Sequence, residues 1–108
     1  MSRTDEATSI MSETAGTHHS WTFFSNYAHV LVCLAQDPSA RLRDIAAQVR
    51  ITERATQRIV GQLEAAGVLK KLPEGRRNHY QIDLKFPLRH PLESHKTVGS
   101  LLKMVQEQ

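Results

Sequence analysis

The side chains best suited to chemistry lie on one stretch of the chain, between residues 53 and 62. They end in guanidinium, amide or carboxylate groups: Glu53, Arg54, Gln57, Arg58 and Gln62. Guanidinium and amide groups can form paired hydrogen bonds with guanine and adenine edges, in a major groove wide enough to admit a helix. Taken alone, the same residues would equally suit a solvated helix face.

Two short helices are predicted to hold these side chains in place. Inward-facing residues recur at helical spacing in both, as Leu42, Ile45, Ala46 and Val49, then as Thr56, Ile59, Val60 and Leu63. About three residues, 50–52, separate the two patterns, which is the connection length of a helix-turn-helix. Thr52 is placed to cap the second helix and Gly67 to end it. The polar set of residues 53–62 then faces outward.

A basic hairpin is predicted directly after the second helix. Residues 68–72 and 80–84 have the composition of two strands, and Pro73, Glu74 and Gly75 form a turn between them. Its tip carries adjacent arginines. Cations at this tip and around the first predicted helix suit phosphate or the minor groove, and with the capping threonine they form a second candidate set: Arg41, Arg43, Thr52, Lys70, Arg76 and Arg77.

A helix-turn-helix followed by a basic-tipped hairpin is the order of a winged helix. From Ser25 to Asp83 the chain resembles winged helix-turn-helix transcriptional regulators of the MarR and ArsR type. The resemblance rests on the run Leu63-Glu-Ala-Ala-Gly-Val-Leu69 and on Glu74-Gly-Arg-Arg-Asn-His-Tyr80, which is similar to an ArsR-type wing. It implies a mainly α fold with a small β-hairpin, extended here by a C-terminal helix, and double-stranded DNA as partner. The predicted helix before the turn has no cysteine, so the resemblance implies no metal site.

The charge distribution agrees with a polyanionic partner. Residues 25–90 contain 11 Lys and Arg against 6 Asp and Glu, whereas the flanking residues carry no excess of positive charge. A chain of 108 residues is long enough for one modest core. We therefore expect residues 21–90 to form one nucleic-acid-binding domain.

The two ends of the chain differ from this middle. Residues 1–20 are rich in Ser, Thr and Glu and are predicted to be a disordered tail. A helix from about Thr22 or Ser25 to Gln36 follows, and after a proline-containing connection a last helix begins near Ser94, within residues 91–108. The apolar residues at both ends exceed what one small core is expected to bury, which predicts a homodimer through Trp21, Phe23, Phe24, Val98, Leu101, Leu102 and Val105.

Other classes of function have little support in the sequence. Cys33 is the only cysteine, which excludes an intramolecular disulfide and favours the cytoplasm. The histidines match no zinc-site spacing, and we find no nucleophile elbow, phosphate-binding glycine loop or paired catalytic carboxylates. No apolar run approaches the roughly 20 residues of a membrane span. We expect no enzyme, no cofactor and no membrane association, and the sequence identifies no small-molecule effector.

Two functions remain from different classes. The first is a sequence-specific DNA-binding transcriptional regulator. The alternative is a winged-helix module that binds protein through the apolar surfaces near Trp21 and Leu101, without direct DNA contact. The arginines clustered on the second helix and the hairpin tip favour the first.

Overall fold

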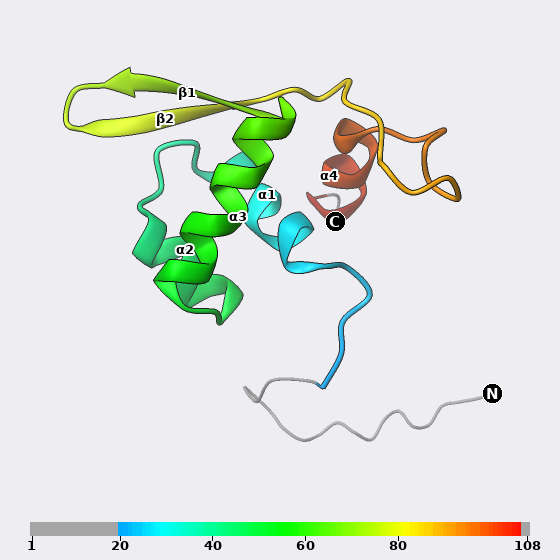
Figure 1. Ribbon diagram of the computed structural model, residues 1–108, viewed down its shortest axis with the longest axis horizontal. Coiled ribbons are helices and arrows are strands. Elements are labelled where there is room, and N and C mark those ends of the chain that lie inside the picture. Colours follow the sequence, from blue (N-terminus) through cyan, green and yellow to red (C-terminus); the bar gives the residue numbers. More distant parts are fainter. Residues whose placement is uncertain (1–19, 107–108) are drawn as a thin grey trace.

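A computed structural model describes residues 20–106, and the predicted tail lies almost entirely outside this range. The helices are α1 (Asn26–Gln36), α2 (Leu42–Val49), α3 (Glu53–Ala66) and α4 (Val98–Gln106), and the strands are β1 (Leu69–Glu74) and β2 (Arg77–Ile82). Figure 1 shows the hairpin β1–β2 extending from the top of α3. Helix α1 lies between α3 and α4 in this view. The predicted fold class is confirmed: a winged helix-turn-helix with an added C-terminal helix.

The core is formed where α1, α2, α3 and the base of the hairpin meet. Its fully buried side chains are Leu34 and Val30 of α1, Ile45 of α2 and Thr56 of α3. Thr56 is tolerated because its hydroxyl donates to the carbonyl oxygen of Thr52 at 3.0 Å. The inward stripes predicted for α2 and α3 therefore do face this core.

The break between α2 and α3 has local causes. Arg50 ends α2 in the left-handed region with φ of 70°. Thr52 then begins α3 as its N-cap, and its hydroxyl accepts a hydrogen bond from the backbone N–H of Ala55 at 3.0 Å. Gly67 ends α3 with φ of 91°, as predicted.

The two strands pair closer to the hairpin tip than the sequence predicted, although the whole hairpin, residues 69–82, is shorter than the predicted 68–84. Residues 73 and 74 continue β1, and β2 begins at Arg77, three residues before its predicted start. The turn is therefore Gly75 and Arg76 instead of residues 73–75, and Gly75 has φ of 62°. Pro73 pairs with Asn78. A proline can occupy this strand because β1 has a single neighbour, so its missing N–H can face away from the ladder. The second strand ends at Ile82, two residues before the predicted end.

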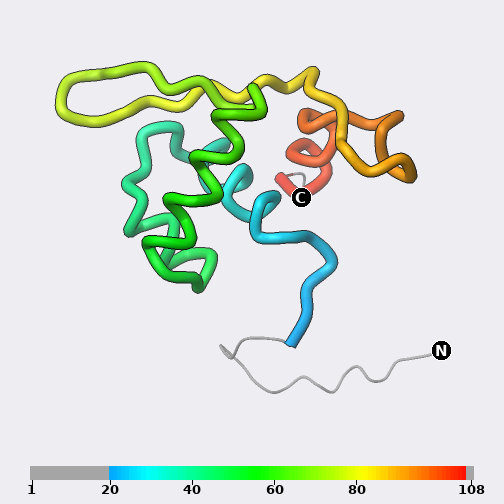
Figure 2. Tube along the Cα trace, in the orientation of Figure 1, coloured from blue at the N-terminus to red at the C-terminus, as the bar shows by residue number. Residues whose placement is uncertain are grey.

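Helix α4 starts at Val98, four residues after the predicted start. The preceding connection, drawn in yellow and orange in Figure 2, folds back on itself. Leu88 donates its backbone N–H to the carbonyl oxygen of Lys96, and Val98 donates to that of Phe86, both at 2.9 Å. This pairing brings α4 back against α1 and the end of the hairpin.

The sequence predicted that Val98 and Leu102 of α4 contribute to a dimer interface, and this arrangement corrects that prediction. Val98 and Leu102 are only 4% and 3% exposed and belong to the chain's own core. The domain thus buries more of its C-terminal helix than its length suggested, because the connection returns α4 to the core instead of extending it into solvent. No helix within residues 20–106 is long and apolar enough to cross a membrane.

Candidate nucleic-acid interface

The outward face of α3 is the first part of the candidate interface. Thr56, Ile59, Val60 and Leu63 turn inward, and the polar side chains between them are exposed, namely Glu53, Arg54, Gln57, Arg58 and Gln62. A helix of 14 residues is about 21 Å long and can lie in a major groove about 12 Å wide. Arg54 and Arg58 lie one turn apart on its first half, where recognition helices contact base edges.

The wing adds a second basic element beside the start of α3. A hollow of about 360 Å³ lies between the turn before α2, the first residue of α3 and the hairpin tip. Arg41, Glu53, Arg76 and Arg77 all line it, although they come from three separate segments. The structure thereby brings three of the proposed phosphate-contacting cations close to Glu53, the first residue of the proposed base-facing set.

The wing is held at this position by contacts between the middle of β2 and the loop before α2. The backbone N–H of Tyr80 donates to the carbonyl oxygen of Pro38 at 2.9 Å. The His79 ring nitrogen Nδ1 lies 3.2 Å from the hydroxyl of Ser39 and 3.2 Å from a carboxylate oxygen of Glu74. Ser39 and His79 are not among the residues predicted from the sequence, because nothing local to them predicts that the loop before α2 meets the hairpin.

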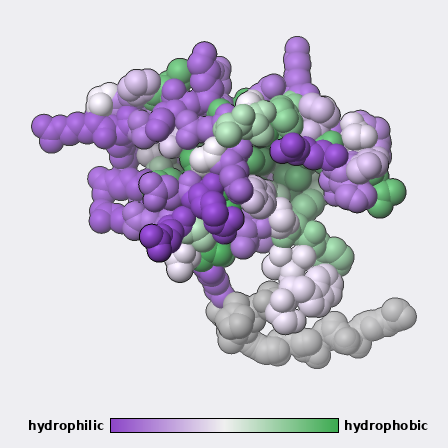
Figure 3. All heavy atoms as spheres, viewed as in Figure 1, coloured by the Kyte–Doolittle hydropathy of each residue, from purple (hydrophilic) through white to green (hydrophobic). Residues whose placement is uncertain are grey.

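Within the described residues the arginines of this surface form no ion pair, although Glu53 lines the same hollow as Arg41, Arg76 and Arg77. Among residues 20–106 the one ion pair within 4.0 Å joins His79 and Glu74, so none of the arginines of α3 or of the wing is paired there. Figure 3 shows hydrophilic side chains gathered over the hairpin, α2 and α3, whereas hydrophobic atoms are more frequent toward α4. Unpaired guanidinium groups on one side of a domain attract a polyanion, and binding releases its counterions.

Of the eleven predicted contact residues seven do not line this hollow, and Arg43, Lys70 and Gln62 are among them. Arg43 is exposed in the first turn of α2. Lys70 lines a different hollow, at the base of the hairpin, together with Gly67 and Gln81. Gln62 lies on the last half of α3, and its side-chain oxygen accepts a hydrogen bond from the hydroxyl of Tyr27 on α1.

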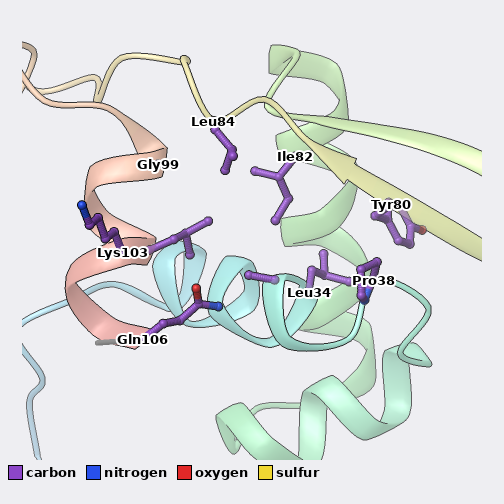
Figure 4. Close-up of a pocket in the computed structure, with 10 residues that line it drawn as sticks. Leu34, Pro38, Tyr80, Ile82, Leu84, Gly99, Lys103 and Gln106 are labelled. Carbon is purple, nitrogen blue, oxygen red and sulfur yellow. The ribbon is translucent and has the colours of Figure 1, made fainter. Parts of the chain in front are cut away.

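The larger concave sites are mainly apolar. One cavity of about 700 Å³ lies between α1, β2 and α4, and Figure 4 shows Leu34, Ile82 and Leu84 around it with Lys103 and Gln106 on α4. Burial raises the pKa of Tyr80, which also lines it, and a nearby carboxylate, Glu64, adds to the rise. The phenol therefore stays protonated at neutral pH and is no ready base.

Two further features concern chemistry at other positions. Burial also raises the pKa of the Cys33 thiol, which disfavours the reactive thiolate at neutral pH. Within residues 20–106, no three side chains among His, Cys, Asp and Glu cluster closely enough to hold a metal ion.

Comparison with known families agrees with this geometry. Residues 29–70 match the sequence model of the winged helix-turn-helix DNA-binding family. The matched region contains most of α1, all of α2 and α3, and the start of β1. No curated protein matches the chain.

Proposed function

Since the chain carries a winged helix-turn-helix domain of the DNA-binding type, we propose that it is a sequence-specific transcriptional regulator. The observation that carries the proposal is the set of exposed arginines on α3 and the wing, none of which forms an ion pair with another of residues 20–106, together with the hollow that Arg41, Arg76 and Arg77 share. Base edges would be read by Glu53, Arg54, Gln57 and Arg58. Phosphates or a minor groove would be contacted by Arg41, Arg43, Thr52, Lys70, Arg76 and Arg77.

Gln62 has a different place in this proposal. Its amide oxygen is engaged by Tyr27, so the side chain is held toward α1. Its remaining amide hydrogens are still available as donors, which keeps it as a candidate at the far end of the base-facing set.

We further propose a MarR- or ArsR-like regulator that acts as a homodimer in the cytoplasm, where its DNA would be. Apolar surface near both ends of the described residues, 20–106, supports the dimer: Trp21 is 66% exposed, Phe23 90% and Val105 39%. Phe24 and Leu101 are partly buried and would sit at the edge of such an interface. A two-fold dimer would place two α3 helices about one DNA turn apart, roughly 34 Å. Sedimentation of the wild type and of Phe23→Glu tests this, because an exposed residue can be changed without loss of the fold.

The direct test of function is selection of bound fragments from genomic DNA, followed by titration of the selected duplex and of a shuffled duplex. We expect the selected duplex to bind at least about a thousandfold more tightly, the usual lower range for specific recognition. Equal affinity for both duplexes would reject sequence-specific regulation.

The alternative remains a winged-helix module that binds protein without contacting DNA. The exposed pair Trp21 and Phe23, whose rings meet edge to face at 5.0 Å, supports it, because aromatic pairs are common at protein interfaces. Such a module would bind neither duplex at physiological salt. The same titration therefore separates the two functions.

A further inference from the structure

Helix α3 contains a glycine at the middle of its outward face. Arg54, Arg58 and Gly61 recur at i, i+4 and i+7, on the line opposite the buried residues Ile59 and Leu63. Glycine costs a helix interior about 1 kcal/mol relative to alanine, because it loses more backbone freedom on folding. A glycine at this position therefore requires a reason.

The domain itself provides no such reason. A Cβ atom built on Gly61 would have no heavy atom of another residue within 4 Å apart from the helix's own backbone and adjacent residues. Gly61 also has no positive φ, so alanine could adopt its conformation without strain. Alanine at this position would therefore stabilise the folded chain.

The glycine of α4 is a useful contrast. A Cβ on Gly99 would lie 2.9 Å from the carbonyl oxygen of Leu84 and 3.2 Å from its Cβ. Gly99 also donates its backbone N–H to that oxygen at 2.9 Å. Figure 4 shows Leu84 beside Gly99 at the end of the hairpin strand. Close packing inside the chain thus explains Gly99 and leaves Gly61 unexplained.

We infer that Gly61 is the point where the sugar–phosphate backbone of bound DNA comes closest to α3. This inference rests on the proposed DNA-binding function. Gly61 lies about 10 Å along the helix from Arg54, at 1.5 Å per residue. A straight helix diverges from a groove that winds around the duplex, so its first turns reach the bases while a later turn passes the groove wall. Without a side chain at that turn, the wall can contact the helix backbone directly.

The size of residue 61 also determines how deeply Arg54 and Arg58 enter the major groove. A side chain at residue 61 would hold the helix away from the groove wall and draw Arg54 and Arg58 back from the base edges. Gly61 is therefore a specificity-determining residue although it offers no hydrogen-bonding side chain. Its contribution is the close approach that lets its neighbours read bases.

Gly61→Ala and Gly61→Leu test the inference on the selected duplex. We expect Gly61→Ala to raise the Tm of the free protein by about 4 °C or more, the shift that removing one helical glycine gives a domain of this size. It should weaken binding to the selected duplex by about tenfold or more, as overpacking a close contact does, and Gly61→Leu should weaken it further. Binding to a shuffled duplex should change less.

Gly99→Ala is the matched control. It adds the same methyl group to a helical glycine but should lower the Tm and leave the affinity of the folded protein for DNA unchanged. If Gly61→Ala lowers the Tm, or raises it with DNA binding intact, the inference is overturned while the proposed function stands. If the wild type binds no duplex, both are rejected.

Discussion

Helices α3 and α4 have similar local patterns and different surroundings. Each has an apolar stripe, a threonine at its start and one glycine. The inward stripe of α3 is buried throughout, whereas in α4 Val98 and Leu102 are buried and Val105 is 39% exposed. The opposite face of α3 is basic, and that of α4 includes Met104, 57% exposed. Periodicity identifies a helix and its apolar face, but not whether that face meets the chain's own core or a partner.

The largest effect should come from breaking the attachment of α4. Leu102→Ala removes a side chain that is 3% exposed, so we expect the free energy of unfolding to fall by about 2–5 kcal/mol, from reduced burial and the remaining cavity. Val105→Ala on the same helix should change it by no more than about 0.5–1 kcal/mol. Denaturant unfolding measures both. Equal small decreases would mean that α4 is not seated on the core in solution.

Substitutions on the outward face of α3 should weaken DNA binding and leave the stability of the folded chain unchanged. Arg54→Ala and Arg58→Ala should each weaken binding to the selected duplex by about 1–3 kcal/mol and affect a shuffled duplex much less, because each change removes hydrogen bonds to a base edge. Lys103→Ala, an exposed cation on α4, is the control and should change neither. Equal weakening on both duplexes would assign these arginines to the phosphates.

Substitutions in the wing should mainly change how DNA affinity depends on salt concentration. Replacing Arg76 and Arg77 with alanine should lower affinity for all duplexes and reduce the slope of log affinity against log salt by about 1 for each phosphate that the protein no longer neutralises. The hollow that these residues share with Arg41 motivates the prediction. Arg89→Ala, an exposed cation on the connection before α4, should leave the slope unchanged. The same slope for the wing variant would exclude phosphate binding by its tip.

The smallest effects should come from the two capping threonines. The Thr52 hydroxyl caps α3 by accepting a hydrogen bond from the backbone N–H of Ala55. Thr97 directly precedes α4, and its hydroxyl accepts a hydrogen bond from the backbone N–H of Ser100 at 3.2 Å. Each Thr→Ala change should cost about 0.5–2 kcal/mol of stability. At a temperature where both variants are folded, only Thr52→Ala should also weaken DNA binding, since it lies at the proposed interface. Ser25→Ala should cost little, because Ser25 makes no side-chain cap bond.

Several features of this protein follow from the sequence alone because they depend on neighbouring residues. The turn between α2 and α3, the cap at Thr52 and the end of α3 at Gly67 are set by backbone preferences and hydrogen bonds within about four residues. The outward position of Arg54 and Arg58 follows from helical spacing. The excess of cations in residues 25–90 is likewise a property of composition.

Tertiary structure decided the features that join distant residues. Local patterns do not predict that the loop at Ser39 meets His79, that Tyr27 engages Gln62, or that Arg41 shares a hollow with the hairpin tip. The length of the hairpin also depends on pairing, since Pro73 is acceptable in a strand with one neighbour. The same holds for α4, because Val98 and Leu102 are buried only when the connection before the helix folds back. The spacing of apolar residues within a helix does not indicate which surface that helix will pack against.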